Sequence, residues 1–363
     1  MKKKKAVVFF SNAYAGIASY QAQNINYLLK KKTNTYLFDE NPIFTLRELK
    51  YKNKKSLNII NIHPIKKIFK NIKIFKKKFL YFDQKYKKIY ISISNPVFIF
   101  LYLFFFLKLI KNKKIVLILT VHSGILTWSI KSIFLHFIYS FLFFIPKKII
   151  FVSKYTKNWW KKIFYLNKIV KKSKVIKHGT EIDNSKKKIN KKIIFNVGFV
   201  GRIEKEKDPI LFNKIALLSS IKNENFRFNL FGDGDLKKKI IQKSYGMINF
   251  YGWKSDKAEI YENIDILLIT SPTESLSYVA LEAKSYGIPS VTCSKGGIRE
   301  VIKNGYDGIY LDSNEPEEIL NALIKCRKNY KNYSRNSYKL SKNFDEDKNL
   351  NKFWKFCYDE EIK

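Results

Sequence analysis

The chain of 363 residues is long for one hydrophobic core and suits two domains of ordinary size. Lys and Arg outnumber Asp and Glu by 70 to 30, and the excess lies mainly before position 181, where 38 basic and four acidic residues give +34 against +6 in the remainder. The cysteines, Cys293, Cys326 and Cys357, have neither CxxC spacing nor a neighbouring His cluster, which argues against a zinc site or disulfide framework and indicates a reducing compartment.

The uneven placement of charge indicates a partner of opposite charge. A lysine-rich composition typical of an AT-rich genome explains part of the excess, but not its concentration in one half. Such a field attracts nucleic acid, an anionic leaflet or an acidic substrate. We expect an anionic membrane surface first and nucleic acid as the rival, although no nucleic-acid recognition motif is present.

The amino terminus resembles a signal peptide, with lysines at 2–5, an apolar run and an Ala-x-Ala at 13–15. The apolar core is too short for that role, so the run is predicted to be a first buried strand. Residues 97–107 and 133–145 are apolar and aromatic but shorter than the roughly 20 residues of a spanning helix. Core helices are favoured there, with a membrane-facing surface as the alternative because tryptophans and lysines flank them.

Strands and helices are predicted to alternate through both halves. The first half has strands at 6–10, 35–38, 88–93, 115–121 and 148–152 and a helix at about 17–31. The second has strands at 193–200, 227–231, 248–251 and 264–270 and helices at 209–220 and 236–244. This alternation predicts βαβ units and parallel sheets. Residues 50–88 are lysine-dense without a clear pattern and are expected to be basic surface.

A polar, lysine-rich segment at 184–192 is the candidate linker. It divides the chain into a strongly basic acceptor-binding domain, 1–183, and a donor-binding domain, 184–342. Residues 343–363 are predicted to form an amphipathic helix that packs back toward the first domain.

Glu274 and Glu282 bracket the junction between a buried strand and a helix. In a strand-loop-helix unit the helix N-terminus sits at the carboxyl edge of the sheet, where free N–H groups and the helix dipole favour a phosphate. Both carboxylates can then approach a ligand whose phosphates rest on the amides near Ser277 and Tyr278. The arrangement suits a sugar nucleotide.

Arg202 and Lys207 lie just ahead of another predicted helix. The planar fork of Arg and the point charge of Lys can together neutralise a diphosphate leaving group. In so basic a chain, chance alone also explains such a pair.

Taken together, these motifs resemble the retaining glycosyltransferases of family 4, which have the α/β GT-B fold of two facing Rossmann-like domains with parallel sheets and an interdomain cleft. The matching pieces between about 193 and 325 are Gly201-Arg202 with Lys207, Phe231-Gly232-Asp233-Gly234, Phe250-Tyr251-Gly252-Trp253, Asp265 to Ser271, the Glu-x7-Glu of Glu274 and Glu282, Tyr286-Gly287-Ile288-Pro289, Gly296-Gly297 with Glu300, and Asn304 to Gly308. Weaker matches before them are Gly16, Thr120-Val121-His122, Phe151 to Lys154 and Val175 to Glu181.

The resemblance implies a role for each matching residue. Arg202 and Lys207 would hold the donor diphosphate. Glu282 would hydrogen-bond the ribose, and Glu274 would contact the donor sugar or steady the site. His122 would contact the sugar. The residues implied to bind the donor are Gly16, Gly201, Gly234, Gly252, Trp253, Ser277, Tyr278, Val279 and Glu282, beside the catalytic set His122, Arg202, Lys207 and Glu274. Where the family usually has Glu-Gly-Phe-Gly, this chain has Glu274-Ser275-Leu276-Ser277, which leaves the shape of the sugar pocket open.

Plainer interpretations stand beside these. Asp233-Gly234-Asp235 imitates a metal-binding DxD motif but falls in a glycine loop, and no metal is expected there. His122 alone would be read as a core histidine, and His63, His136 and His178 as structural. Glu300 more simply caps or orients a loop.

The sequence therefore predicts a retaining, metal-independent, hexosyltransferase-type enzyme without a cofactor. It would move a sugar from a UDP- or GDP-sugar to a glycan, lipopolysaccharide or lipid-linked acceptor, associated peripherally with the inner face of the cytoplasmic membrane and not with nucleic acid. Front-face substitution would need positioning and charge stabilisation rather than a protein nucleophile. The alternative is a non-catalytic GT-B-like protein that binds polyanions or membranes.

Overall fold

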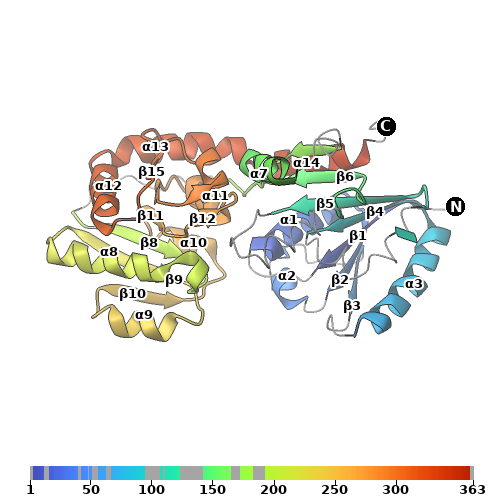
Figure 1. The fold of residues 1–363 in the computed structure, drawn as a ribbon, viewed down its shortest axis with the longest axis horizontal. Coiled ribbons are helices and arrows are strands. Elements are labelled where there is room, and N and C mark those ends of the chain that lie inside the picture. Colours follow the sequence, from blue (N-terminus) through green and yellow to red (C-terminus); the bar gives the residue numbers. More distant parts are fainter. Residues whose placement is uncertain are drawn as a thin grey trace. The chain divides into compact units, whose positions relative to one another are not determined.

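The structure, a computed structural model, describes residues 3–11, 16–39, 42–47, 49–50, 56–62, 67–94, 107–108, 111–122, 142–164, 172–182 and 193–359. The chain divides into two compact units. Unit 1 is Met1–His178 with Asp347–Lys363, and unit 2 is Gly179–Glu346 (Figure 1). Each unit is built on its own parallel sheet.

The described part of unit 1 contains a seven-stranded sheet in the order β3-β2-β1-β4-β5-β6-β7, with every neighbouring pair parallel. Its strands are β1 (Lys3–Ser11), β2 (Asn34–Asp39), β3 (Leu57–Asn61), β4 (Tyr86–Ile93), β5 (Ile115–Val121), β6 (Lys148–Phe151) and β7 (Ser173–Val175). Its helices are α1 (Gly16–Lys30), α2 (Ile43–Arg47), α3 (Ile68–Lys85), α7 (Lys154–Phe164) and, for most of its length, α14 (Glu346–Tyr358).

Helix α14 packs onto unit 1 through aromatic side chains. The ring of Trp354, fully buried, meets Phe9 of β1 edge-on at 6.2 Å. Phe353 lies 6.2 Å from Tyr20 of α1. These contacts join the last helix of the chain to the first strand and the first helix of the unit.

Unit 2 contains a six-stranded parallel sheet in the order β10-β9-β8-β11-β13-β15. Its strands are β8 (Phe195–Val200), β9 (Phe226–Phe231), β10 (Ile248–Gly252), β11 (Ile266–Ile269), β13 (Ser290–Thr292) and β15 (Gly308–Tyr310), and a separate pair consists of β12 (Thr273–Glu274) and β14 (Lys295–Gly296). The helices are α8 (Pro209–Ile221), α9 (Lys237–Lys243), α10 (Lys257–Tyr261), α11 (Tyr278–Ser285), α12 (Pro316–Lys328) and α13 (Tyr330–Ser341), with short 3₁₀ turns at Lys205–Lys207, Gly297–Glu300 and Lys342–Phe344.

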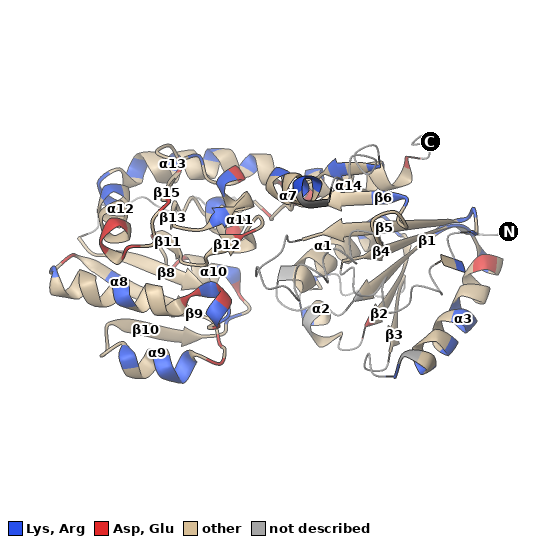
Figure 2. Ribbon diagram, viewed as in Figure 1, with Lys and Arg blue, Asp and Glu red and all other residues tan. Residues whose placement is uncertain are grey.

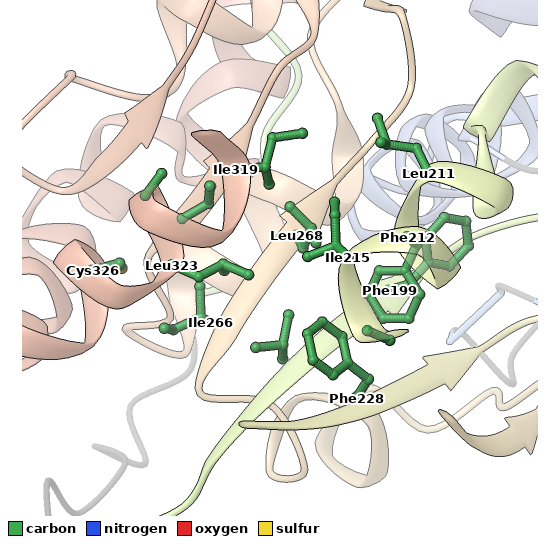
Figure 3. Packing of buried hydrophobic residues seen from close by; sticks show 14 of the residues in the cluster. Phe199, Leu211, Phe212, Ile215, Phe228, Ile266, Leu268, Ile319, Leu323 and Cys326 are labelled. Carbon is green, nitrogen blue, oxygen red and sulfur yellow. The ribbon is translucent and has the colours of Figure 1, made fainter. Parts of the chain in front are cut away.

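Helices α8 and α12 pack together over one face of this sheet (Figure 3). Phe212 and Ile215 of α8 meet Phe199 of β8, and Leu323 of α12 joins the same cluster. Burial of these side chains stabilises the unit by roughly 1.5–3 kcal/mol each. The packing fixes the starting point of α8, and with it the loop that precedes the helix.

Glycines allow the loops after β8 and β9 to approach each other at backbone distance. The Ile203 N–H donates to the Asp233 carbonyl at 2.9 Å, and the Gly201 N–H donates to the Phe231 carbonyl at 3.0 Å. A Cβ on Gly232, whose φ is +148°, would overlap the carbonyl oxygen of Gly201. Gly234, at φ +156°, is similarly close to the backbone of Ile203.

The structure differs from the sequence-based predictions for residues 50–88 and Gly16. Residues 50–88 were expected to be basic surface without clear elements. The absence of elements was wrong, because β3 and α3 lie here and Phe75, Phe79 and Phe82 anchor α3 in the core, whereas the exposed lysines of α3 do form basic surface. Gly16 was expected in a loop and is instead the first residue of α1. The candidate linker at 184–192, the alanines at 13–15 and most of the apolar runs at 97–107 and 133–145 lie outside the described residues.

Among the residues that the structure describes, no helix combines the length and the apolar character needed to cross a membrane.

Gly232→Ala should lower the free energy of unfolding by about 3 kcal/mol, because the methyl group forces apart two loops that touch through their backbones. Urea unfolding measures the change. Gly305→Ala is the matched control: its φ is also positive, +71°, but nothing lies within 4 Å of the added Cβ, so a loss of only about 1 kcal/mol is expected. Equal losses in the two variants would show that the loop contact is unimportant.

Candidate functional site

The strand order of unit 2 identifies the place where a ligand is expected. Numbered along the unit, the strands lie in the order 3-2-1-4-5-6, so the direction of winding reverses between β8 and β11. In open parallel sheets, ligands bind beyond the carboxyl ends of the strands at such a reversal. The loops that leave β8 and β11 carry Arg202, Lys207 and Glu274.

Lys207 and Glu274 join these two loops. The Nζ of Lys207 lies 2.6 Å from Oε1 of Glu274, and the hydroxyl of Ser271 donates to the same oxygen at 2.8 Å. The Thr270 hydroxyl donates to the Lys207 carbonyl at 2.9 Å. Only 10% of the Glu274 side chain is exposed, against 30% of that of Lys207. The ammonium is thus held in place while part of it faces solvent.

Arg202 is paired within its own loop. Its Nη1 donates to Oε2 of Glu204 at 2.6 Å, and its Nη2 donates to Glu206. The Arg202 side chain is 44% exposed. An exposed ion pair contributes little to stability, typically below 1 kcal/mol, so the Arg202 fork can exchange its partners at low cost.

Glu282 is held by two side chains of α10. The Tyr261 hydroxyl donates to Oε2 at 2.7 Å, and Nζ of Lys257 lies 2.6 Å from Oε1. Lys257 and Tyr261 are four residues apart and therefore lie on the same face of the helix. Tyr261 is fully buried, and burial raises its phenol pKa well above the ordinary value, with a further contribution from the Glu282 charge. The hydroxyl is therefore a donor at neutral pH.

The start of α11 has an unusual backbone. Ser277, the N-cap residue, has φ +67° and ψ +100°, and its side chain caps no helix N–H. Its hydroxyl is buried and has no hydrogen-bond partner among the described residues. A residue in this conformation costs of order 1–3 kcal/mol, and such strain gathers at binding sites. Tyr278 and Val279 follow as the first two residues of α11, where helix N–H groups have no intrahelical acceptor.

The remaining predicted donor residues of unit 2 lie at the same edge of the sheet. Gly201 follows β8, Gly234 follows β9, Gly252 ends β10, and Trp253 comes next with 55% of its surface exposed. In the motif resembling DxD, Asp233 accepts a hydrogen bond from its neighbour's N–H at 2.9 Å and lies 3.2 Å from Nζ of Lys237. These hydrogen bonds hold the pKa of that carboxyl below its usual range.

His122 and Gly16 belong to unit 1, and their predicted roles toward the donor stay predictions. His122 follows β5, with its ring 4.8 Å from that of Tyr20 and 5.2 Å from that of His178. Its Nε2 is buried and has no hydrogen-bond partner in the described part of the chain. Burial lowers the pKa of His122 to about 3, so the imidazole is neutral at pH 7.

Sequence reasoning missed several residues that shape this site. Lys257 and Tyr261 have helical spacing, but nothing in the sequence pairs them with a glutamate 21 or more residues away. Glu204 and Glu206 lie two and four residues after Arg202, so their pairing with it could have been predicted from the sequence. The structure also pairs Lys284 of α11 with Asp307, both almost completely buried, which ties the site helix to the loop before β15.

The buried histidines predict acid sensitivity of unit 1. An exposed histidine titrates near pH 6.5, whereas the folded pKa of His122 is about 3 and that of His178 lies well below the ordinary value, because both are buried. The unfolded chain therefore binds more protons below pH 6.5, and the free energy of unfolding should fall as the pH is lowered, by up to about 1.4 kcal/mol per pH unit for each histidine. Urea unfolding between pH 7 and 5 measures the slope. His122→Gln should make the slope shallower, and an unchanged slope would refute the assignment.

Comparison with known proteins finds several that are similar to the chain. Residues 180–343 match the family Glycosyl transferases group 1. An uncharacterized glycosyltransferase of Methanocaldococcus jannaschii is 29% identical over 259 residues, which is 66% of this chain and 68% of that protein. The UDP-Gal:alpha-D-GlcNAc-diphosphoundecaprenol alpha-1,3-galactosyltransferase of Escherichia coli is 26% identical over 207 residues, 49% of this chain and only 54% of that enzyme.

Solved structures extend the likeness to both units. HepE of Anabaena, solved in complex with UDP and glucose, has a TM-score of 0.76 at 16% identity, covering 97% of this chain and 99% of that one. A likeness of this kind at low identity concerns the fold. The chain therefore has the GT-B fold, and its residues 180–343 are similar to the family Glycosyl transferases group 1.

Proposed function

We propose that this protein is a retaining glycosyltransferase that moves a hexose from a UDP- or GDP-sugar to a glycan, lipopolysaccharide or lipid-linked acceptor. The observation that carries the proposal is the meeting of the Lys207–Glu274 pair and the first turn of α11 at the reversal point of the unit 2 sheet. The relatives support it: the E. coli enzyme is named for a UDP-galactose donor, and HepE was solved with UDP.

The two basic residues bind the donor diphosphate. An ammonium has three N–H donors, so Lys207 can keep its bond to Glu274 and still offer N–H groups to phosphate. Arg202 exchanges Glu204 or Glu206 for a phosphate oxygen, because its present partners are exposed and weakly held. Ser277 and the N–H groups of Tyr278 and Val279 complete the phosphate contacts at the start of α11.

Glu282 binds the ribose. A carboxylate offers about four acceptor positions. Tyr261 takes one on Oε2 and Lys257 one on Oε1, so each oxygen keeps a position for one of the two ribose hydroxyls. The carboxylate is held in place before the nucleotide arrives, which reduces the entropy lost on binding.

Retention of configuration follows from front-face substitution, in which the leaving diphosphate takes the proton of the acceptor. Negative charge then grows on the phosphate oxygens, where Arg202 and Lys207 stabilise it without a metal ion. The work of the protein is positioning and charge stabilisation, so no side-chain nucleophile is required.

The acceptor belongs to unit 1. The diphosphoundecaprenol acceptor named for the E. coli relative supports a lipid-linked acceptor. With such an acceptor, the protein would associate peripherally with the inner face of the cytoplasmic membrane and not with nucleic acid. The net charge of +34 before position 181 fits the diphosphate of such a lipid and the anionic headgroups around it.

A thermal-shift screen against UDP-, GDP- and ADP-sugars tests the proposal. A donor at about 100 times its Kd should add roughly 2.7 kcal/mol of stability, and the sugar that stabilises should then be transferred to a diphosphoundecaprenol-linked acceptor. Absence of stabilisation by every nucleotide sugar would contradict the proposal and favour a non-catalytic binding protein.

Lys207→Ala should lower kcat/KM for sugar transfer by about 100-fold or more, because the developing diphosphate charge loses a fixed cation. Steady-state transfer assays measure the loss. Lys222→Ala, which removes an exposed lysine paired with Glu317 in the same unit, is the matched control and should leave kcat/KM unchanged. Full activity of Lys207→Ala would rule out the assigned diphosphate contact.

Tyr261→Phe should weaken nucleoside diphosphate binding by about tenfold or more, since a hydrogen bond to a carboxylate such as that of Glu282 is worth about 1.5–3 kcal/mol. Titration calorimetry with the matching diphosphate and with its 2′,3′-dideoxy analogue measures the effect. The variant and the parent protein should bind the dideoxy analogue equally. A loss of the same size for both ligands would mean that Tyr261 does not act through the ribose.

A further inference from the structure

Helix α3 of unit 1 has one face in the core and the opposite face in solvent. Phe75, Phe79 and Phe82 are buried, with exposed fractions of 0 to 6%. Phe75 meets Phe10 of β1 at 5.0 Å, and Phe82 meets Tyr36 of β2 at 4.5 Å. These aromatic contacts fix the rotation of the helix about its axis and so determine which side chains face outward.

The outward side combines large apolar groups with lysines. Phe69 is 84% exposed, Leu80 68% and Tyr81 43%. Five lysines are exposed on the same helix: Lys70, Lys73, Lys76, Lys77 and Lys78. We call the set Phe69, Lys73, Lys76, Lys77 and Leu80 the α3 outer face. Figure 2 shows basic residues along much of this helix.

The spacing places the apolar residues of the α3 outer face in one line. Phe69 and Leu80 are eleven residues apart, three helical turns, so they project in nearly the same direction about 16 Å apart. Lys73, Lys76 and Lys77 lie between them. A helix lying flat on a bilayer would insert both apolar side chains at once and keep the lysines at the level of the headgroups.

The charge of the helix is not compensated within the described chain. The acidic residue of α3, Asp83, is 3.0 Å from Nζ of Lys114 and also accepts a hydrogen bond from Asn112. The lysines of the α3 outer face have no ion pair with any residue that the structure describes. Exposed cations beside exposed apolar side chains match an anionic lipid surface, whereas duplex nucleic acid would use chiefly the cations and no base would stack on the aliphatic Leu80.

We propose that the α3 outer face is the surface with which unit 1 binds an anionic bilayer. The binding is interfacial: the helix lies on the membrane, and Phe69 and Leu80 enter the boundary between headgroups and acyl chains. This proposal rests on the proposed function, in which the acceptor is linked to a lipid. Bilayer binding is measured without any sugar donor, so it can fail or succeed independently of sugar transfer.

Vesicle co-sedimentation with the full-length protein tests the proposal. Vesicles of phosphatidylcholine with 30 mol% phosphatidylglycerol are compared with phosphatidylcholine alone. Because each lysine near an anionic bilayer raises partitioning roughly fivefold, the triple variant Lys73→Gln, Lys76→Gln, Lys77→Gln should bind anionic vesicles on the order of 100-fold more weakly. The double variant Phe69→Ser, Leu80→Ser should bind the same vesicles at least about tenfold more weakly and keep the salt dependence of the parent.

A matched control removes the same charge from another exposed helix. Lys238, Lys239 and Lys243 of α9 in unit 2 are exposed and, like the α3 lysines, lack an ion pair with a described residue. Replacing all three with Gln should change vesicle binding by less than about fivefold. All replaced side chains are exposed, so thermal unfolding midpoints should match the parent and exclude misfolding.

Three outcomes would overturn the proposal. The first is an equal loss of vesicle binding in the α9 and α3 lysine variants, which would mean that only total charge matters. The second is undiminished vesicle binding by the Phe69→Ser, Leu80→Ser protein. The third is binding to a duplex DNA probe that is as tight as binding to anionic vesicles and that depends on the α3 lysines but not on Phe69 or Leu80. This result would make the face a nucleic-acid surface.

Discussion

One carboxylate oxygen, Oε1 of Glu274, joins the two loops on which the candidate site is built. It meets Nζ of Lys207 from the loop after β8 and the hydroxyl of Ser271 from the loop after β11. Removing the cation from a carboxylate that is 90% buried lowers the stability of the protein by several kcal/mol. The two loops therefore stay together, and the position of Lys207 is set by the fold rather than by the flexibility of its side chain.

Differences in burial divide the site charges into fixed and exchangeable ones. Glu274 and Glu282 are 10% and 13% exposed and are held by neighbours from other segments. Arg202 is 44% exposed, and in the described chain its ion pairs are with Glu204 and Glu206 of its own loop. A diphosphate can therefore replace the present partners of Arg202 without breaking the contacts of Glu274 and Glu282. The same contrast between an anchored and an exposed side distinguishes the inner and outer faces of α3 in unit 1.

The regular elements of unit 2 were predictable because their apolar residues follow the period of a strand or helix. The strand predicted at 264–270 contains β11, and the helix predicted at 209–220 is α8 with one more residue. The strand order was not predicted, although the GT-B resemblance implied parallel sheets. The helix within residues 50–88 was missed because lysines and apolar side chains such as Phe69 and Leu80 share its solvent-facing positions, which hides the spacing of the buried Phe75, Phe79 and Phe82.

The sequence by itself determined the kind of fold: βαβ alternation, the glycine loops, and the basic and acidic residues whose spacing resembles that of the family 4 glycosyltransferases. Those signals are local or survive as fixed spacings, so they can be read without coordinates. Only the tertiary structure decided the partners of each charge: Lys207 with Glu274, Glu282 with Tyr261 and Lys257, and Arg202 with Glu204 and Glu206. Partner choice depends on distances of a few ångströms between segments far apart in sequence, and these distances exist only once the sheet has set its strand order.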